Sequence, residues 1–290
     1  MARFARCRSF RAVRSVILCA LALALLAGSS AAFNFTTVDV PGAIETYITG
    51  ITGSKLAGYY TDSSGVHHGF MRKGGVFTTI DVPAAPQTFA WGIKGSKIIG
   101  FSCDPGVTCH GYVRARDGSF TTIDVPAATE TEAYGLAGGK IVGSYSDGTT
   151  DHAFLREKNG TFTTIDPPGS TSAKAIGINK AGQIVGFYSD GTKSFGFLRE
   201  PNGAFTTIDV PGALSTFAFG INKGGQIVGA WRFNNFIVVG FLRETNGSFS
   251  NLNAESTRET WAYGISKTTS IVGLNIKSNN GGVHGFLATP

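Results

Sequence analysis

The sequence has little charge, few cysteines and no motif of the common catalytic families. Only 15% of its 290 residues are charged and four are cysteine, whereas an average soluble domain is about 25% charged. It contains no GxSxG, HExxH, Walker or helix-opening GxGxxG pattern. These absences give no support to a serine hydrolase, a zinc protease, an ATPase or a dinucleotide-dependent enzyme. Glycine (40) and phenylalanine (22) are abundant instead, and this composition favours an all-β protein.

The first 32 residues contain five arginines and no acid, followed by an apolar run and by small residues before Phe33. This order is typical of a secretory signal peptide. The apolar run is shorter than the roughly 20 residues of a membrane span, so an uncleaved anchor is the less favoured alternative. Cleavage predicts a mature chain of residues 33–290 in the periplasm or outside the cell, with no stable membrane insertion.

Removal of this leader changes the charge and the cysteine count. The remaining 20 Lys and Arg oppose 19 Asp and Glu, so the net charge gives no electrostatic reason to expect nucleic acid as a partner. Cys103 and Cys109 remain in the segment CDPGVTC. In an oxidising compartment we expect them to form a disulfide, with a free pair or a metal site as the alternatives. A zinc site lacks clustered histidines, since only His110 is adjacent.

The chain from residue 33 onward repeats one unit six times, with a period of about 43 residues. The Phe-Thr-Thr marker recurs at Phe35, Phe77, Phe120, Phe162 and Phe205, with a degenerate copy at Phe249. Each unit contains four strand-like stretches separated by turn residues such as Asn-Gly and Asp-Gly. We therefore predict a six-bladed β-propeller of four-stranded antiparallel blades. Residues 35–40 would complete the last blade beside residues 283–288 and close the ring; an open stack of six units is the alternative.

The repeats also carry recognisable motifs: the triplet His152-Ala153-Phe154, the GIN…GQIVG segments and the GxFTTID tails. They resemble the extracellular HAF repeat family of bacterial exported proteins over residues 33–290. The His-Ala-Phe triplet is complete only once, and two of the units lack the histidine. The resemblance implies export and a repeat fold. It implies no particular reaction and no catalytic residues.

One column of the repeat varies between units and is the candidate ligand-binding set. It stands three residues before the recurrent glycine of the first strand and comprises Tyr47, Phe89, Glu132, Lys174, Phe217 and Trp261. If the first strand lies nearest the axis, these side chains approach the mouth of the central channel, where aromatic faces and two charges suit a sugar or another flat ligand. The alternative is that the aromatic residues are interblade core and that Glu132 pairs with Lys174. The residues directly before the glycine, such as Trp91 and Tyr134, are expected between the blades.

Four glutamates near the same mouth are the candidate catalytic residues: Glu45, Glu130, Glu132 and Glu259. Paired carboxylates can hydrolyse glycosides, and clustered oxygens can bind Ca²⁺. No other metal or cofactor is predicted. The alternative for these residues is simple solvation in loops.

Two further columns predict structural hydrogen bonds. The histidines His68, His110, His152 and His284 share one repeat position, whereas a catalytic base should be singular. The aspartates Asp39, Asp81, Asp124, Asp166 and Asp209 precede Val-Pro or Pro-Pro turns. We expect them to accept hydrogen bonds from the backbone amides that follow.

The sequence thus predicts an exported, monomeric, non-enzymatic binding module that uses one face of a propeller to bind a carbohydrate or a protein partner. The first alternative is a secreted or periplasmic hydrolase, lactonase or lyase that uses the channel-mouth carboxylates, with or without calcium. The second is a structural or adhesive surface protein. An enzyme is the less favoured of these hypotheses, because no catalytic signature accompanies the repeat.

Overall fold

The computed structural model describes residues 33–104, 108–278 and 281–290, so the predicted signal peptide at residues 1–32 lies outside the described residues. The described chain contains 24 β-strands and no helix, which confirms the prediction of an all-β protein. Accordingly, none of this part of the chain forms a helix that could span a bilayer.

The strands follow the sequence repeat, four to a unit. The N-terminal strand is β1 (Asn34–Thr37). The first three groups of four are β2 (Glu45–Thr52), β3 (Lys55–Thr61), β4 (His67–Lys73), β5 (Val76–Ile80), β6 (Gln87–Lys94), β7 (Lys97–Cys103), β8 (Cys109–Arg114), β9 (Phe120–Ile123), β10 (Glu130–Ala137), β11 (Lys140–Ser146), β12 (Asp151–Arg156) and β13 (Phe162–Thr164). The others are β14 (Ser172–Ile178), β15 (Ile184–Ser189), β16 (Ser194–Arg199), β17 (Phe205–Ile208), β18 (Ser215–Ile221), β19 (Ile227–Arg232), β20 (Val238–Arg243), β21 (Phe249–Leu252), β22 (Thr257–Ile265), β23 (Ile271–Lys277) and β24 (Val283–Thr289).

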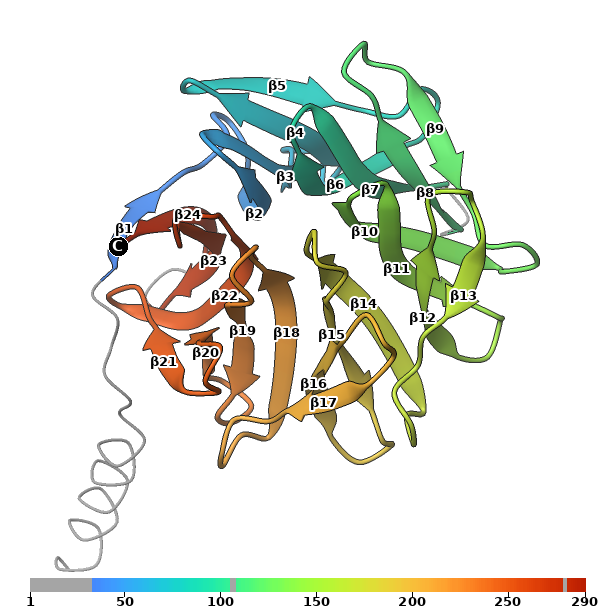
Figure 1. The fold of residues 1–290 in the computed structure, drawn as a ribbon. Helices are drawn as coiled ribbons and strands as arrows, with labels where there is room; N and C mark the ends of the chain where they lie inside the picture. Colours follow the sequence, from blue (N-terminus) through green and yellow to red (C-terminus); the bar gives the residue numbers. More distant parts are fainter. Residues whose placement is uncertain (1–32, 105–107, 279–280) are drawn as a thin grey trace, which may run out of the picture.

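Four antiparallel sheets contain four consecutive strands each, beginning with β2, β6, β10 and β14. The other eight strands form one sheet, because a single parallel pair, Val238 with Glu259, joins β20 to β22. The N-terminal β1 pairs antiparallel with the C-terminal β24, with Phe35 opposite Ala288. Figure 1 shows the sheets arranged around a common centre, and the first strands of all six units line one pocket there.

Every first strand carries a bulge at the same repeat position. In β10, Ala133 pairs with Gly143 and Gly135 pairs with Val142, which leaves Tyr134 without a partner across the ladder. The side chains of Glu132 and Tyr134 lie on the same side of the strand, because the Tyr134 hydroxyl donates a hydrogen bond to the Glu132 carboxylate. The expectation that the residue before the glycine fills the space between sheets is therefore wrong. This column faces the common centre.

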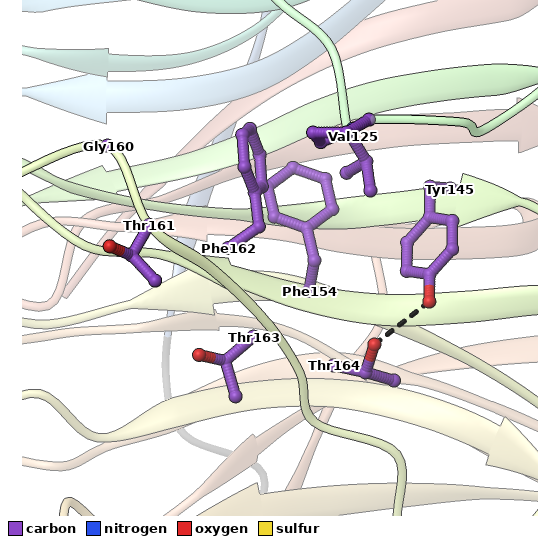
Figure 2. A pocket seen from close by; sticks show the side chains of 9 residues that line it. Val125, Tyr145, Phe154, Gly160, Thr161, Phe162, Thr163 and Thr164 are labelled. Carbon is purple, nitrogen blue, oxygen red and sulfur yellow. Dashed lines mark hydrogen bonds between the residues drawn. The ribbon is translucent and has the colours of Figure 1, made fainter.

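The core lies between adjacent sheets and repeats with the sequence. A fully buried phenylalanine stands at one position of the third strand: Phe70, Phe154, Phe197, Phe241 and Phe286. Each packs against the phenylalanine of its Phe-Thr-Thr motif; the Phe154 and Phe162 ring centroids are 5.5 Å apart. Figure 2 shows these two rings beside Tyr145 in a shallow pocket of about 390 Å³. Burial of one large ring in each of these units contributes to the hydrophobic stabilisation at regular intervals along the chain.

A disulfide joins Cys103, the last residue of β7, to Cys109, the first residue of β8. The two cysteines are cross-strand partners, and both side chains are buried beside Phe101 in one apolar cluster. The disulfide expected from the sequence is thus formed in the structure.

Candidate functional site

The strand directions give the molecule two distinct faces. The first strand of each unit begins on one face, named here the glutamate face because Glu45 and Glu130 begin β2 and β10 there. It ends at the hairpin to the second strand on the opposite face, named here the lysine face because Lys55 and Lys140 follow those hairpins. The turns between third and fourth strands also lie on the lysine face, since strands in these sheets alternate in direction.

Charged side chains segregate between the two faces. The glutamate face holds fifteen of the 19 acids that follow residue 32: Asp39, Glu45, Asp62, Asp81, Asp104, Asp124, Glu130, Glu132, Asp147, Asp151, Asp166, Asp190, Asp209, Glu255 and Glu259. The lysine face holds fifteen of the 20 cations: Lys55, Arg72, Lys73, Lys94, Lys97, Arg114, Arg116, Lys140, Arg156, Lys158, Lys180, Arg199, Lys223, Arg243 and Lys267. A net charge near zero therefore conceals two faces of opposite charge.

The aromatic members of the candidate binding column pack into one cluster near the centre of the glutamate face. Phe89, Phe217 and Trp261 border a buried group that includes Phe101 and Tyr134. The Phe89 and Phe101 rings stack with centroids 4.8 Å apart, and those of Phe217 and Trp261 are 5.9 Å apart. Phe89, Phe217 and Trp261 are only partly buried. The predicted alternative, that these aromatics belong to the core, is confirmed in part, because each also keeps an accessible edge.

Glu132 and Lys174 form an ion pair between neighbouring units, as the alternative predicted. Lys174 Nζ lies 2.9 Å from Glu132 Oε2 and 3.3 Å from Asp151 Oδ2. The Glu132 carboxylate also accepts hydrogen bonds from Ser144, at 3.2 Å, and from Tyr134. Burial of the ammonium acts to lower the pKa of Lys174, but the negative charges of its partners outweigh burial and raise that pKa. Burial raises the pKa of Tyr134, and the Glu132 charge adds to the rise.

Two other candidate glutamates bond an aromatic residue two positions later on the same strand. Glu45 Oε2 accepts a hydrogen bond of 3.0 Å from the Tyr47 hydroxyl. Glu259 Oε2 accepts one of 3.0 Å from Trp261 Nε1. Sequence reasoning missed these pairs, although residues two apart on a strand share a face and the Glu-x-Tyr and Glu-x-Trp spacing was visible. Burial, followed by the hydrogen bond that the Tyr47 hydroxyl donates to Glu45, raises the pKa of Tyr47.

The fourth candidate, Glu130, begins β10 on the same face and has no side-chain hydrogen bond in the described part of the chain. The described residues also contain no group of three or more His, Cys, Asp or Glu side chains placed to hold a metal ion. The structure thus brings the four acids to one face and engages three of them in hydrogen bonds within the protein.

Beneath this mouth, aromatic side chains from the bulge column meet around the centre. Trp91 contacts Tyr134 and Tyr263 with ring centroids 5.0 and 5.7 Å apart. Phe219 contacts Tyr263 at 4.9 Å. The pocket that remains at the lysine end of these strands is only about 100 Å³. Packed aromatic rings therefore fill the centre beneath the glutamate-face ends of the first strands.

No protein-family model matches the chain, and no curated protein matches it by sequence. Several solved structures resemble its fold. TolB from Acinetobacter baumannii has a TM-score of 0.60 at 11% identity, covering 81% of this chain and 63% of that one. A streptogramin B lyase has a TM-score of 0.51 at 17% identity, covering 88% and 87%. A mutant Aleuria aurantia lectin in complex with alpha-methyl-L-fucoside has a TM-score of 0.51 at 15% identity, covering 88% and 97%. The chain has a β-propeller-like fold. At these identities the likeness shows the fold alone.

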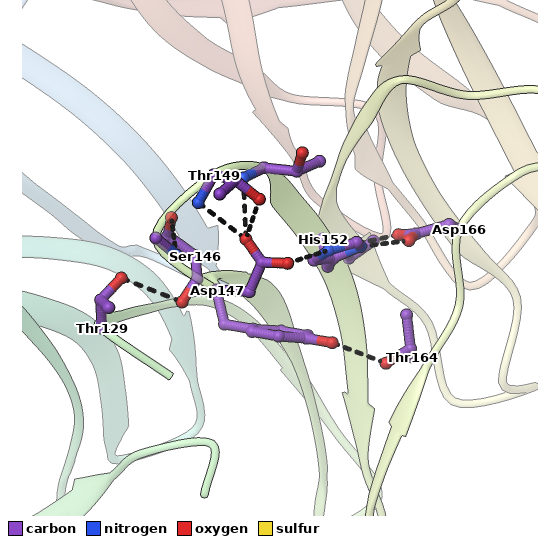
Figure 3. Close-up of polar contacts among 11 residues, drawn as sticks. Thr129, Ser146, Asp147, Thr149, His152, Thr164 and Asp166 are labelled. Atoms are coloured by element: carbon purple, nitrogen blue, oxygen red, sulfur yellow. Dashed lines mark hydrogen bonds and ion pairs between the residues drawn. The ribbon is translucent and has the colours of Figure 1, made fainter. Parts of the chain in front are cut away.

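The repeated histidines of the propeller-like chain each bond an aspartate on the glutamate face. His152 Nδ1 lies 2.7 Å from Asp166 Oδ2 and Nε2 lies 3.4 Å from Asp147 Oδ2, as Figure 3 shows. The equivalent distances from Nδ1 to the carboxylate are 2.9, 3.0 and 2.8 Å for the pairs His68–Asp81, His110–Asp124 and His284–Asp39. The structural hydrogen-bonding role predicted for the histidines is confirmed.

The predicted partners of the aspartates were wrong. Asp166 Oδ1 accepts a hydrogen bond of 2.8 Å from the backbone amide of Ala153, which lies on the third strand of the unit. Within the described chain it does not accept one from the backbone amides of the turn that follows Asp166. In the unit where phenylalanine replaces the histidine, Lys193 bonds the aspartate Asp209 at 2.8 Å. The carboxylate thus ties the third strand to the start of the next unit. Sequence spacing could not show this cross-strand partner.

Stability should depend on pH through His152. The hydrogen bond to Asp166 raises the pKa of His152, burial opposes the rise, and Asp147 adds to it. A raised pKa means that the stabilisation is complete below the ordinary histidine value near 6.5 and is lost as pH rises through the folded-state value. We expect His152→Gln to lower the free energy of unfolding by about 1 kcal/mol at pH 6 and by clearly less at pH 8.5, measured by urea denaturation. Asp166→Asn should weaken the pH dependence, since Asp166 is the larger cause of the raised pKa and only Asp147 then remains. A His152→Gln deficit that is constant with pH would contradict this account.

Proposed function

We propose that the protein is an exported six-bladed propeller of the HAF repeat type that acts as a non-enzymatic binding module through its glutamate face. Pairing of β1 with β24 supports a ring completed by the N-terminal strand. The shared central pocket, lined by one strand of each of the six units, supports a radial arrangement of the blades. The proposed location is the periplasm or the cell exterior.

The observation that carries the binding proposal is the composition of the mouth. Accessible edges of Phe89, Phe217 and Trp261 are held in a packed cluster. Carboxylates such as Glu45 and Glu259 are fixed beside the aromatic rings by hydrogen bonds. Aromatic rings stack on the apolar faces of sugars, and fixed carboxylate oxygens accept bonds from hydroxyl groups. We infer that the ligand is a neutral or positively charged carbohydrate, since acids dominate this face.

The bonding of the acids favours binding over the hydrolase, lactonase or lyase alternative. Glu132 accepts three hydrogen bonds, one of them from an ammonium group at 2.9 Å, and is therefore committed to the structure. Glu45 and Glu259 are each bonded to an aromatic side chain. Glycoside hydrolysis requires two carboxyl groups free to face the substrate, and only Glu130 remains unengaged among the four candidates.

Glycan binding tests the proposal directly. The mature protein should bind a carbohydrate on a glycan array, and calorimetry should show at least a tenfold loss of affinity in Trp261→Ala and in Phe89→Ala, since stacking on a sugar contributes about 1–2 kcal/mol. Phe195→Ala is the matched control, because this ring is partly buried at the glutamate-face end of β16 and stacks on Tyr188, outside the apolar cluster that holds Phe89 and Trp261. Absence of saturable glycan binding, or equal losses in all three variants, would contradict the proposal and favour a structural or protein-binding role.

A further inference from the structure

A further pocket lies on the lysine face, at the junction of the first and second units. It has a volume of about 630 Å³ and is lined by four cations, Lys55, Lys73, Arg114 and Arg116, together with the hydroxyls of two hairpins and Met71. No carboxylate lines it. It therefore lies on the opposite face from the proposed carbohydrate site and has the opposite charge.

The excess of positive charge in this pocket is specific to the first unit, as a comparison with the equivalent positions of later units shows. Lys55 and Lys73 are direct cross-strand partners. In three later units the position of Lys73 holds a glutamate, and the position of Lys55 holds a residue that bonds it: Lys140 with Glu157 at 3.0 Å, Gln183 with Glu200 at 3.1 Å, and Gln226 with Glu244 at 2.9 Å. The first unit thus places two lysines where three other units place a glutamate bonded to a lysine or a glutamine. Like charges opposite each other on a sheet are unfavourable unless something compensates them.

Further contacts fix these cations without neutralising them. Lys55 Nζ donates a 3.0 Å hydrogen bond to the Gly95 carbonyl of the next unit, which holds the ammonium at the junction. The Arg114 guanidinium lies 5.9 Å from the centroid of the Phe120 ring. None of the four lining cations forms an ion pair in the described part of the chain. The Asp117 carboxylate, which interacts electrostatically with Arg114, accepts hydrogen bonds from Ser119, and these hold the pKa of Asp117 low, with a smaller contribution from Arg114.

We propose that this pocket binds a ligand that carries at least two phosphate charges. Guanidinium groups donate paired hydrogen bonds to phosphate oxygens, and lysine ammonium groups supply compact charge between them. The volume suits a small phosphorylated molecule or the phosphorylated end of a larger one. The negative charge of the ligand would compensate the repulsion between Lys55 and Lys73. In the third unit, Glu157 compensates the charge of Lys140 in the same place. A soluble phosphorylated glycan and a membrane phosphate headgroup share this chemistry.

Calorimetry with pyrophosphate and inositol hexakisphosphate tests the pocket, using the mature protein at physiological salt. Wild type should show saturable binding. Lys73→Glu should lower the affinity at least tenfold, because it restores the pairing found in other units and removes the excess charge. Lys223→Glu is the matched control, since it makes the same change in charge on the same face, in the β18–β19 hairpin outside the pocket. Its affinity should change less than twofold.

Equal losses in the two variants would show general attraction to a basic face and overturn the proposal, as would the absence of saturable binding to the soluble phosphates and to vesicles. The melting temperature of Lys73→Glu should equal or exceed that of wild type, since Lys55 gains a partner. If that variant is unstable, Arg116→Gln provides the same test with a change in an exposed hairpin residue. Binding to phosphatidylglycerol vesicles without binding to the soluble phosphates would assign the site to a headgroup; the reverse would assign it to a soluble ligand.

Discussion

Replacing Gly143 by alanine is expected to lower the free energy of unfolding by about 3 kcal/mol or to prevent folding. A Cβ atom at this position would lie far inside contact distance of the Glu132 carbonyl oxygen and 2.6 Å from the Phe154 ring. The carbonyl belongs to the bulged strand β10 and cannot rotate away without disturbing its ladder. Overpacking of a core costs about 1–3 kcal/mol even where side chains can adjust, and backbone atoms adjust less. Urea denaturation followed by circular dichroism measures the effect.

Gly224→Ala is the matched control for this substitution. Gly224 lies in the β18–β19 hairpin, where the nearest heavy atom to a built Cβ is the Asn222 side-chain oxygen at 3.3 Å. A side chain can shift by a few tenths of an ångström, so we expect a change of less than about 1 kcal/mol. If the two alanine variants unfold at the same urea concentration, the fold does not require a glycine at position 143 beside the Glu132 carbonyl.

The number and order of the strands were predictable because the turns between them have recognisable sequences. The Asn-Gly and Asp-Gly turns between third and fourth strands require a residue with positive φ, and Gly118, Gly160, Gly203 and Gly247 have φ between 91° and 97°. Combined with the period of the repeat, these turns give the number and order of strands. They depend only on local backbone chemistry, which a single sequence records.

The orientation of the innermost residues was not predictable in the same way. A simple alternation counted back from Gly135 takes no account of the extra residue Tyr134, which becomes visible only when β10 and β11 are paired. The bulge brings Tyr134 beside Glu132. The residues directly before the recurrent glycine, which were expected between the blades, therefore lie beneath the candidate site. Segregation of charge, in contrast, was available from the sequence, because alternate hairpins must lie on opposite faces. Summing the charges over the whole chain hid it.

Replacing Phe154 by alanine should lower the free energy of unfolding by about 3–5 kcal/mol, the usual cost of deleting a fully buried ring. The Phe154 side chain has no exposed area, and it lies against the recurrent Gly143 of the adjacent strand, so the space left behind has no neighbour that can fill it.

Phe162→Ala tests whether that cost arises from the interior position. Phe162 packs edge-on against Phe154 in the same sheet but is only half-buried and borders the shallow pocket of Figure 2. Water can enter the space that this substitution opens, so we expect a loss of about 1–2 kcal/mol by the same urea measurement. Equal losses would mean that both rings stabilise the sheet mainly through their contact with each other. A loss at Phe154 at least twice as large would place the stabilising contact between sheets, where the recurrent glycine lets the ring approach the backbone.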